Sequence, residues 1–189
     1  MGQATTTTTR RGVSTVSRGR WNYSRKEGTR SEDRFVSACE ARGYTTNKST
    51  REEDINLHID YYVDRGQREA VSVDVKGGNH PHTIWVEFKN VRGNAGWMYG
   101  KADWIAFELP EVGGFAMVLR SELATLAEEI VEPVFVSKQE ADRKLYQRKD
   151  RKDVISRLWL EDIQQCKSYN ILKYADPNTE TRRGEKQIP

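Results

Sequence analysis

The sequence lacks most features of disulfide-stabilised, secreted and membrane-spanning proteins. Only two of its 189 residues are cysteine, Cys39 and Cys166, which excludes a disulfide scaffold and a four-cysteine zinc site. No run of about 18 apolar residues is present, which excludes a transmembrane helix, and the N-terminus has no apolar segment of the kind found in signal peptides. We therefore expect a protein of a reducing, cytoplasmic compartment with no membrane partner.

The motifs of several enzyme classes are also missing. The sequence contains no P-loop, no dinucleotide-binding fingerprint and no serine in a nucleophile motif. Histidine is scarce, and the pair in His80-Pro81-His82 has no cysteine or third histidine nearby, which argues against a metal-finger nuclease of the HNH type. We expect this loop to form a turn or to contact phosphate.

Basic residues are concentrated at the N-terminus. Residues 1–30 contain seven Lys and Arg against one acid, whereas the remainder contains 24 basic and 27 acidic residues. Residues 1–28 are also too poor in apolar side chains to pack a core, so we expect a disordered basic arm suited to phosphate contacts without sequence specificity. A solvated tail, or contact with RNA or a membrane, is the alternative. The arginines expected to bind DNA are Arg10, Arg11, Arg18 and Arg20.

Hydrophobic periodicity and breaker residues predict a helix, several strands and a second helix. A capping box at residues 29–32 predicts a helix from about residue 30 to residue 43. The second helix is expected at residues 121–131, and the chain end at 176–189 is expected to fray. This order is typical of an α/β or α+β protein with a central sheet. Strands are expected at 44–50, 55–63, 71–75, 84–89, 103–108, 115–119, 134–136 and 154–160.

Acidic residues fall on one face of neighbouring predicted strands. Because side chains alternate along a strand, Asp74 and Lys76 share the face opposite the valines of their strand, and Asp60 lies on the polar face of the preceding strand. A turn centred near Gln67 pairs Asp60 with Asp74. Opposed residues of antiparallel strands have Cβ atoms about 5 Å apart, so these two carboxylates repel each other unless a cation lies between them.

Paired carboxylates beside a lysine suit metal-dependent phosphate chemistry. Mg²⁺ prefers oxygen ligands and is held by one or two carboxylates together with water and substrate phosphate. Lys76 would stabilise charge growing on the phosphate, or orient and deprotonate a water that the metal activates. Acids and lysines on a strand face are most often a solvated surface, but the paired geometry and the flanking apolar strands favour a site.

These residues resemble the PD-(D/E)XK nuclease superfamily. Its pattern is a helix, a strand, a strand opening with Asp, a strand ending in (Asp/Glu)-x-Lys, and then a helix and a strand. Ile59-Asp60-Tyr61-Tyr62-Val63 is similar to the Asp-bearing strand, and Val73-Asp74-Val75-Lys76-Gly77 is similar to the second motif. Segments 84–90 and 96–103 look more specifically like small phage-type endonucleases. The resemblance implies a restriction-endonuclease-like α/β domain over residues 29–175, with a central mixed sheet flanked by helices.

The resemblance leaves two triplets open. It implies that Asp60 and Asp74 bind Mg²⁺, or Mn²⁺ in its place, and that Lys76 acts at the phosphate. The triplet Glu87-Phe88-Lys89 also satisfies the pattern when combined with Asp74, although the lead-in from the first helix favours the first choice. If the strand of Asp74 lies between the other two, the acids of both triplets converge on one cleft. Glu32 is a further candidate ligand, because many members carry a metal-binding acid on the first helix; a capping role is its alternative.

The sequence therefore predicts a Mg²⁺-dependent DNA endonuclease, located in the host cytoplasm if it is phage-encoded. A junction-resolving nuclease and a non-catalytic DNA-binding protein on the same scaffold are the alternatives. Many members of the superfamily dimerise to cut both strands, so a homodimer is compatible with the resemblance. Arg148 and Arg151, in the basic segment 147–152, are expected to contact the DNA backbone, with a solvated surface as the alternative. Trp97 is expected to pack beneath the sheet rather than stack on a base.

Overall fold

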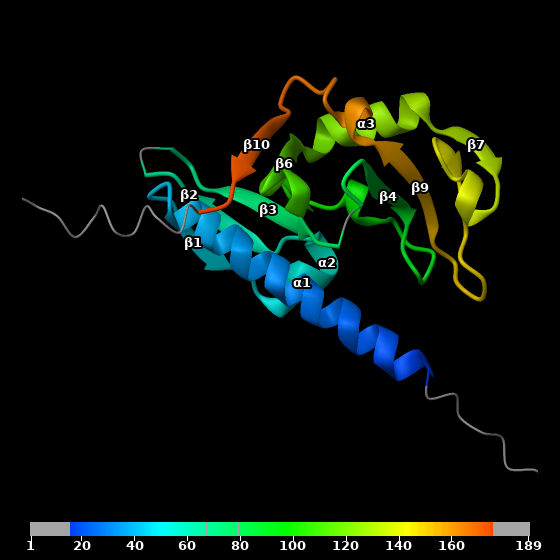
Figure 1. Ribbon diagram of the computed structural model, residues 1–189, viewed down its shortest axis with the longest axis horizontal. Helices are drawn as coiled ribbons and strands as arrows, with labels where there is room; N and C mark the ends of the chain where they lie inside the picture. Colours follow the sequence, from blue (N-terminus) through cyan, green and yellow to red (C-terminus); the bar gives the residue numbers. More distant parts are fainter. Residues whose placement is uncertain (1–15, 67, 79, 176–189) are drawn as a thin grey trace, which may run out of the picture.

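In the computed structural model the chain forms a mixed α/β structure with a mixed central sheet flanked by helices (Figure 1). The structure describes residues 16–66, 68–78 and 80–175. None of the helices in these ranges has the combination of length and apolar character needed to cross a bilayer. In chain order the elements are α1 (Val16–Glu40), β1 (Thr45–Lys48), α2 (Arg51–Leu57), β2 (Tyr61–Asp64), β3 (Val71–Lys76), β4 (Thr83–Lys89), the 3₁₀ helix η1 (Trp97–Tyr99), β5 (Trp104–Leu109), η2 (Pro110–Val112), β6 (Gly114–Leu119), α3 (Arg120–Ile130), β7 (Glu132–Phe135), η3 (Lys138–Glu140), β8 (Lys144–Leu145), β9 (Val154–Trp159), α4 (Leu160–Ile163) and β10 (Asn170–Lys173).

The central sheet has six strands in the order β1-β2-β3-β5-β6-β10. All neighbours run antiparallel except β3 and β5, which are parallel. The next strand along the chain after β3, β4, leaves this sheet and pairs with β9 in a second, two-stranded sheet (Figure 1). The chain therefore passes from β3 to β5 through a crossover made of β4 and η1. Lys76 is the last residue of β3 and lies beside β5.

The two faces of the central sheet are covered by different elements. α1 packs on one face, where Phe35 and Cys39 contact Tyr61 and Val73. The opposite face is covered by β4, β9, η1 and α3, and its core includes Ile84 of β4. Because side chains alternate in β2 and β3, residues with odd numbers face α1 and residues with even numbers face β4 and η1. Asp60 and Asp74 thus point away from α1.

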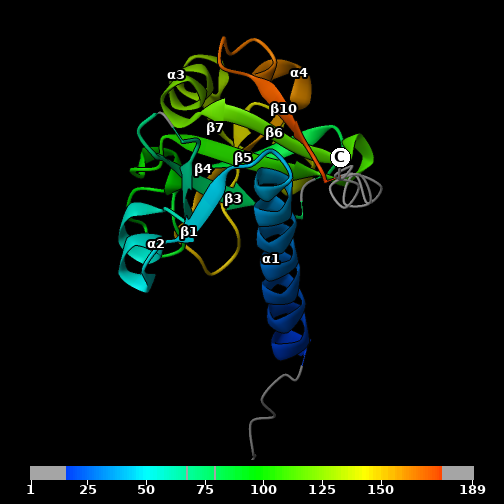
Figure 2. The ribbon, with the colours of Figure 1, turned by 90° about the vertical axis from the view of Figure 1, so that its left-hand side faces the viewer.

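The first helix begins earlier than the sequence predicts. α1 starts at Val16 rather than near residue 30, and Figure 2 shows it projecting beyond the sheet. Residues 29–32, where a capping box is predicted, lie inside α1 instead. There the hydroxyl of Ser31 donates to the buried carboxylate of Glu108 on β5, which also accepts from Arg34 and Tyr174. The helix does end as predicted, where Gly43 has a φ of 78°.

Parts of the predicted N-terminal arm and C-terminal tail lie outside the described residues. These parts are residues 1–15, with Arg10 and Arg11, and residues 176–189. Residues 16–28 of the predicted arm belong to α1 instead. Arg18 and Arg20 fall in this part of the helix, for which side chains are not described.

The strand expected at residues 55–63 begins later, because a helix occupies its first part. Thr50 caps α2: its side chain accepts the N–H of Glu53, and the Glu53 carboxylate accepts the N–H of Thr50. This capping box is legible in the sequence as Thr50-x-x-Glu53. His58, with a φ of 55°, ends the helix. The chain then turns so that Asp60 immediately precedes β2.

Most other predicted elements are confirmed with small differences at their ends. β1, β3, β4, β5, β6, α3, β7 and β9 lie in the predicted segments. β10 is not among the predicted strands; it adds to the edge of the central sheet beside β6. The His80-Pro81-His82 segment forms the expected turn, in which the N–H of Thr83 donates to the carbonyl of His80 at 3.2 Å.

Candidate active site

The register of β2 on β3 brings Asp60 beside Asp74. Tyr61 lies opposite Val73, which is the register predicted from the sequence, and the N–H of Asp60 donates to the Val73 carbonyl at 2.9 Å. Oδ2 of Asp60 accepts the N–H of Val75 at 2.7 Å. The side chain of Asp60 is therefore fixed by the backbone of the strand that carries Asp74. We call Asp60 and Asp74 the acid pair.

Lys76 is held between one member of the acid pair and an aromatic ring. Its Nζ atom lies 2.6 Å from Oδ1 of Asp74 and 5.1 Å from the ring centroid of Trp97, which is a cation–π geometry. Trp97 is buried in the core, so the prediction that it packs beneath the sheet is confirmed. The Lys76 side chain keeps 27% of its surface exposed, and its ammonium group is positioned by these two contacts.

Asp74 has one oxygen without a partner. The residue is 2% exposed, and its Oδ2 atom is buried with no hydrogen-bond donor among the described residues. The neighbouring carboxyl group of Asp60 can pair with it only by carrying a proton or by sharing a cation, because two ionised carboxylates have no proton to donate. Leaving a buried carboxylate oxygen unpaired costs free energy. A positive charge between the two carboxyl groups would therefore stabilise the acid pair.

The electrostatics of the acid pair agree with this geometry. Burial, together with repulsion from Asp74, raises the pKa of Asp60 to about 7. Burial also raises the pKa of Asp74, against the attraction of Lys76. For Lys76, burial alone would lower the pKa, but the surrounding carboxylates, Asp74 foremost, hold it above its usual value. Lys76 therefore remains an ammonium cation, and Asp60 changes charge near neutral pH.

Glu87 reaches the same place from the second sheet. β4 does not pair with β3, so the arrangement considered for the second triplet, with the strand of Asp74 in the middle, does not occur. The physical reason is that β5 occupies that edge of β3, while the apolar face of β4 packs over the central sheet. The carboxylate of Glu87 nevertheless interacts with Lys76 and accepts the backbone N–H of Trp97, although burial raises its pKa.

A glycine allows the close approach of Glu87 and η1. Gly96 donates its N–H to the carbonyl of Phe88 at 2.9 Å. A Cβ atom at Gly96 would lie 2.1 Å from the carbonyl oxygen of Glu87, a distance that no side chain tolerates. Only glycine at this position lets Trp97 bond Glu87 through its N–H while its ring contacts Lys76.

Two predicted site residues do not join the acid pair. Lys89 is exposed at the end of β4, after a register shift between Glu87 and Lys89 that interrupts the alternation expected to place them on one face. Glu32 lies on the α1 side of the sheet, where it binds Lys48 and the hydroxyl of Tyr61. The sheet separates Glu32 from the acid pair, so its predicted role as a metal ligand needs correction. In the second triplet, Glu87 therefore lies near the acid pair and Lys89 does not.

The basic segment 147–152 lies next to Glu87. Arg148 binds Asp153, and both residues influence the carboxyl group of Glu87 electrostatically. Arg151 is exposed. The structure thus places the predicted DNA-contacting Arg148 beside the candidate site, and leaves Arg151 accessible on the same loop.

Two residues near the site were not selected from the sequence. Asp153 is fully buried; it holds Arg148 through Oδ2, while Oδ1 has no partner in the described part of the chain. Its only sequence signal is an acid between a basic run and an apolar strand. His58 interacts with Asp60 and Lys76, and burial followed by the Lys76 charge lowers its pKa. Its one sequence signal is the alternation predicted for residues 55–63, which places it on the same face as Asp60.

The side chains present fit a divalent cation that takes few protein ligands. Within residues 16–66, 68–78 and 80–175, no group of three or more His, Cys, Asp and Glu is arranged to hold a metal ion. The acid pair supplies two carboxylates, a number that Mg²⁺ accepts when water and phosphate complete its shell. The unpartnered Oδ2 of Asp74 is the atom that such an ion would satisfy.

No match to this chain was found among protein-family models, curated proteins or solved structures. Its function is therefore argued from the geometry of the site and the order of its strands. The two observations that count most are the acid pair beside Lys76 and the parallel pairing of β3 with β5.

Proposed function

We propose that the protein is a Mg²⁺-dependent DNA endonuclease of the PD-(D/E)XK type, with Asp60, Asp74 and Lys76 as its catalytic residues. The observation that carries the proposal is the buried Oδ2 atom of Asp74, which lacks a donor although a second carboxyl group lies beside it. Lys76 on the same strand supplies the adjacent cation. Mn²⁺ would serve in place of Mg²⁺, since it shares the preference for oxygen ligands.

The order of the elements supports this proposal. α1 and β1 precede an Asp at the start of β2, β3 ends in Asp-x-Lys, and a strand parallel to β3 follows. The restriction-endonuclease-like pattern has the same order. Two differences are that α2 lies between β1 and β2, and that β4 and the 3₁₀ helix η1 take the place of the α-helix between the last two strands. The second difference brings Glu87 to the site.

The chain's own residues would divide the work as follows. Asp60 and Asp74 would hold the Mg²⁺ ion, which when bound polarises the phosphate and lowers the pKa of its water. Lys76 is kept protonated by its carboxylate neighbours, so it suits stabilising charge on the phosphate and orienting the water better than removing a proton. Its position between Asp74 and the Trp97 ring fixes that charge before substrate binds.

A cleavage assay with an isosteric variant tests the proposal. Asp74→Asn keeps the shape of the side chain, and we expect it to lower the cleavage rate by at least about 100-fold with Mg²⁺ while the thermal transition persists. Asp33→Asn is the matched control, because Asp33 is exposed on α1; it should cleave like the parent. Cleavage by Asp74→Asn at the parent rate, in a preparation free of contaminating nuclease, would refute the proposal.

A second candidate function is DNA binding without catalysis, which the small number of ligands favours. It predicts affinity for DNA that does not depend on Mg²⁺ and no cleavage of any substrate. The candidates are distinguished by incubating the protein, with Mg²⁺ and with EDTA, with linear, supercoiled, single-stranded and four-way-junction DNA. A junction-resolving nuclease should cut mainly the four-way junction. Linear product from supercoiled DNA without a nicked intermediate would indicate two sites acting together, as in a homodimer.

A further inference from the structure

We infer that β4, β9 and the chain after β8 carry a stacking platform for one unpaired DNA base next to the acid pair. The platform consists of Trp85, Tyr146 and Arg157. The inference rests on the proposed function, which sets where the phosphate to be cut would lie. It adds the substrate class, which is DNA with a single-stranded segment. Binding to the platform does not require cleavage, so the two proposals can fail separately.

The three side chains of the platform form one contiguous surface. Trp85 on β4 lies opposite Arg157 on β9, and the guanidinium carbon of Arg157 is 5.7 Å from the Trp85 ring centroid. The ring of Tyr146 lies 6.3 Å from that of Trp85 at an interplanar angle of 52°. Tyr146 is joined to β9 by a bridge to Ile155. All three platform residues are half-buried rather than covered.

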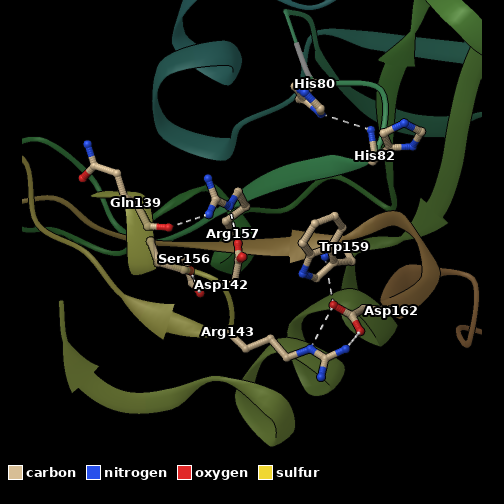
Figure 3. A network of polar contacts seen from close by, with 10 residues as sticks. His80, His82, Gln139, Asp142, Arg143, Ser156, Arg157, Trp159 and Asp162 are labelled. Carbon is tan, nitrogen blue, oxygen red and sulfur yellow. Dashed lines mark hydrogen bonds and ion pairs between the residues drawn. The ribbon is translucent and has the colours of Figure 1, made fainter. Parts of the chain in front are cut away.

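The platform is rigid before any ligand arrives. Arg157 is bound by the carboxylate of Asp142 and donates to the carbonyl of Gln139 at 2.9 Å, as Figure 3 shows. The adjacent Arg143 is fixed in the same way by the buried Asp162 (Figure 3). A guanidinium group held by two partners keeps its place against the Trp85 ring, so little side-chain freedom is lost when a base stacks there.

The platform and the acid pair are connected through β4. Trp85 and Glu87 are two residues apart on the same face of the strand, which separates them by about 7 Å along its axis. The opposite face, with Ile84 and Val86, fills the core. Glu87 interacts with Lys76, so a base on Trp85 would leave its neighbouring phosphate near the lysine of the site.

The charge around the platform suits nucleic acid. The basic segment 147–152 begins directly after Tyr146, and Arg151 and Lys152 on it are exposed. The N–H of Lys152 donates to the carbonyl of Val91 at 3.4 Å, which places the segment beside the loop that follows β4. Aromatic rings next to a basic track are the arrangement that binds single strands, because only unpaired bases offer a free face.

Oligonucleotide binding in EDTA tests the inference without cleavage. Fluorescence anisotropy of a labelled oligo-dT strand and of a duplex of the same length is measured for the full chain. We expect Trp85→Leu and Tyr146→Leu each to weaken single-strand binding by about tenfold and to leave duplex binding unchanged. Trp85→Phe, which keeps a ring, should bind the single strand like the parent.

Tyr99→Leu is the matched control, since Tyr99 is an exposed aromatic residue held to Glu128 of α3; it should bind both DNAs like the parent. If Trp85→Leu fails to fold, Tyr146→Leu decides. Unchanged single-strand binding by the folded Leu variants, or an equal loss for duplex, would overturn the inference. Absence of Mg²⁺-dependent cleavage with the expected binding pattern would instead count against the proposed function alone.

Discussion

Nζ of Lys76 lies 2.6 Å from Oδ1 of Asp74, two residues earlier on the same strand. Because both side chains project from one face of β3, the register of this strand fixes the acid and the cation together. A slip by one residue would turn both toward the α1 side of the sheet. The pairing of Tyr61 with Val73 is thus as important to the site as the charged residues.

The two lysines of the alternative triplets predict different phenotypes. Lys76→Met should lower the DNA cleavage rate by about 100-fold or more, because it removes the ammonium group next to Asp74. Lys89→Met should cleave like the parent, since Lys89 is exposed at the end of β4. Initial rates with saturating Mg²⁺ provide the measurement. The reverse order of activities would assign catalysis to the triplet of Glu87.

The raised pKa of Asp60 predicts how stability depends on pH. In EDTA the folded protein holds a proton on Asp60 up to a pKa of about 7, whereas the ordinary value is 3.8. The folded state therefore binds more protons between these values, and its stability falls as pH rises through that range. Asp60→Asn carries no charge, so it should be more stable than the parent at pH 8 and lose this advantage near pH 4. Thermal transitions of both proteins across this range would show no such crossover if the acid pair were solvated.

Mg²⁺ should reduce the advantage of Asp60→Asn at pH 8. Ligand at ten times its Kd adds about 1.4 kcal/mol of stability, which corresponds to a Tm increase of about 3–6 °C for a chain of this size. We expect this increase for the parent and for Asp33→Asn, but not for Asp60→Asn or Asp74→Asn. Proton competition should make the increase smaller at pH 6. An equal response of all four proteins would show that the ion binds elsewhere.

Arg148 is expected to contribute to stability as well as to DNA binding. Arg148→Ala leaves the buried carboxylate of Asp153 without its counter-charge, at a cost of about 1–3 kcal/mol. Arg151→Ala, an exposed residue of the same loop, should change stability by less than about 0.5 kcal/mol. Urea unfolding measures both. The double variant Arg148→Ala/Asp153→Asn should recover part of the loss, and a single variant as stable as the parent would contradict the proposed pairing.

Glu32 should be dispensable for cleavage. Its partner Lys48 is 63% exposed, and exposed ion pairs contribute at most about 1 kcal/mol. Glu32→Gln is therefore expected to retain the parental cleavage rate and nearly the parental Tm. A loss of activity as large as that of Asp74→Asn would place Glu32 back among the metal ligands.

Local patterns in the sequence were sufficient to predict the central part of the site. Alternation placed Asp74 and Lys76 on one face of their strand, and the turn between the two strands set the register that brings Asp60 beside Asp74. These relations depend on residues close in the chain. The capping box that begins α2 at Thr50 was equally legible, but the apolar residues of 55–63 were assigned to a strand instead.

Relations between distant segments could not be predicted in this way. Nothing in the alternation of β4 says that its partner is β9 rather than β3, because both choices bury Ile84 and Val86. Likewise, nothing near Ser31 in the sequence says that its hydroxyl donates to the buried Glu108 of β5. The position of Glu87 and the partner of Ser31 both depend on such long-range contacts.

The pairing of β4 with β9 has a consequence for how the protein is made. Residues of β3 leave the ribosome well before those of β9, so the nascent chain carries the acid pair for some time without the strand that pairs with β4. Such non-local closure is slow compared with local helix and hairpin formation. A fragment that ended after α3 would leave Ile84 and Val86 without Leu158 of β9 beside them, and the core beneath the site is therefore completed only after β9 has been synthesised.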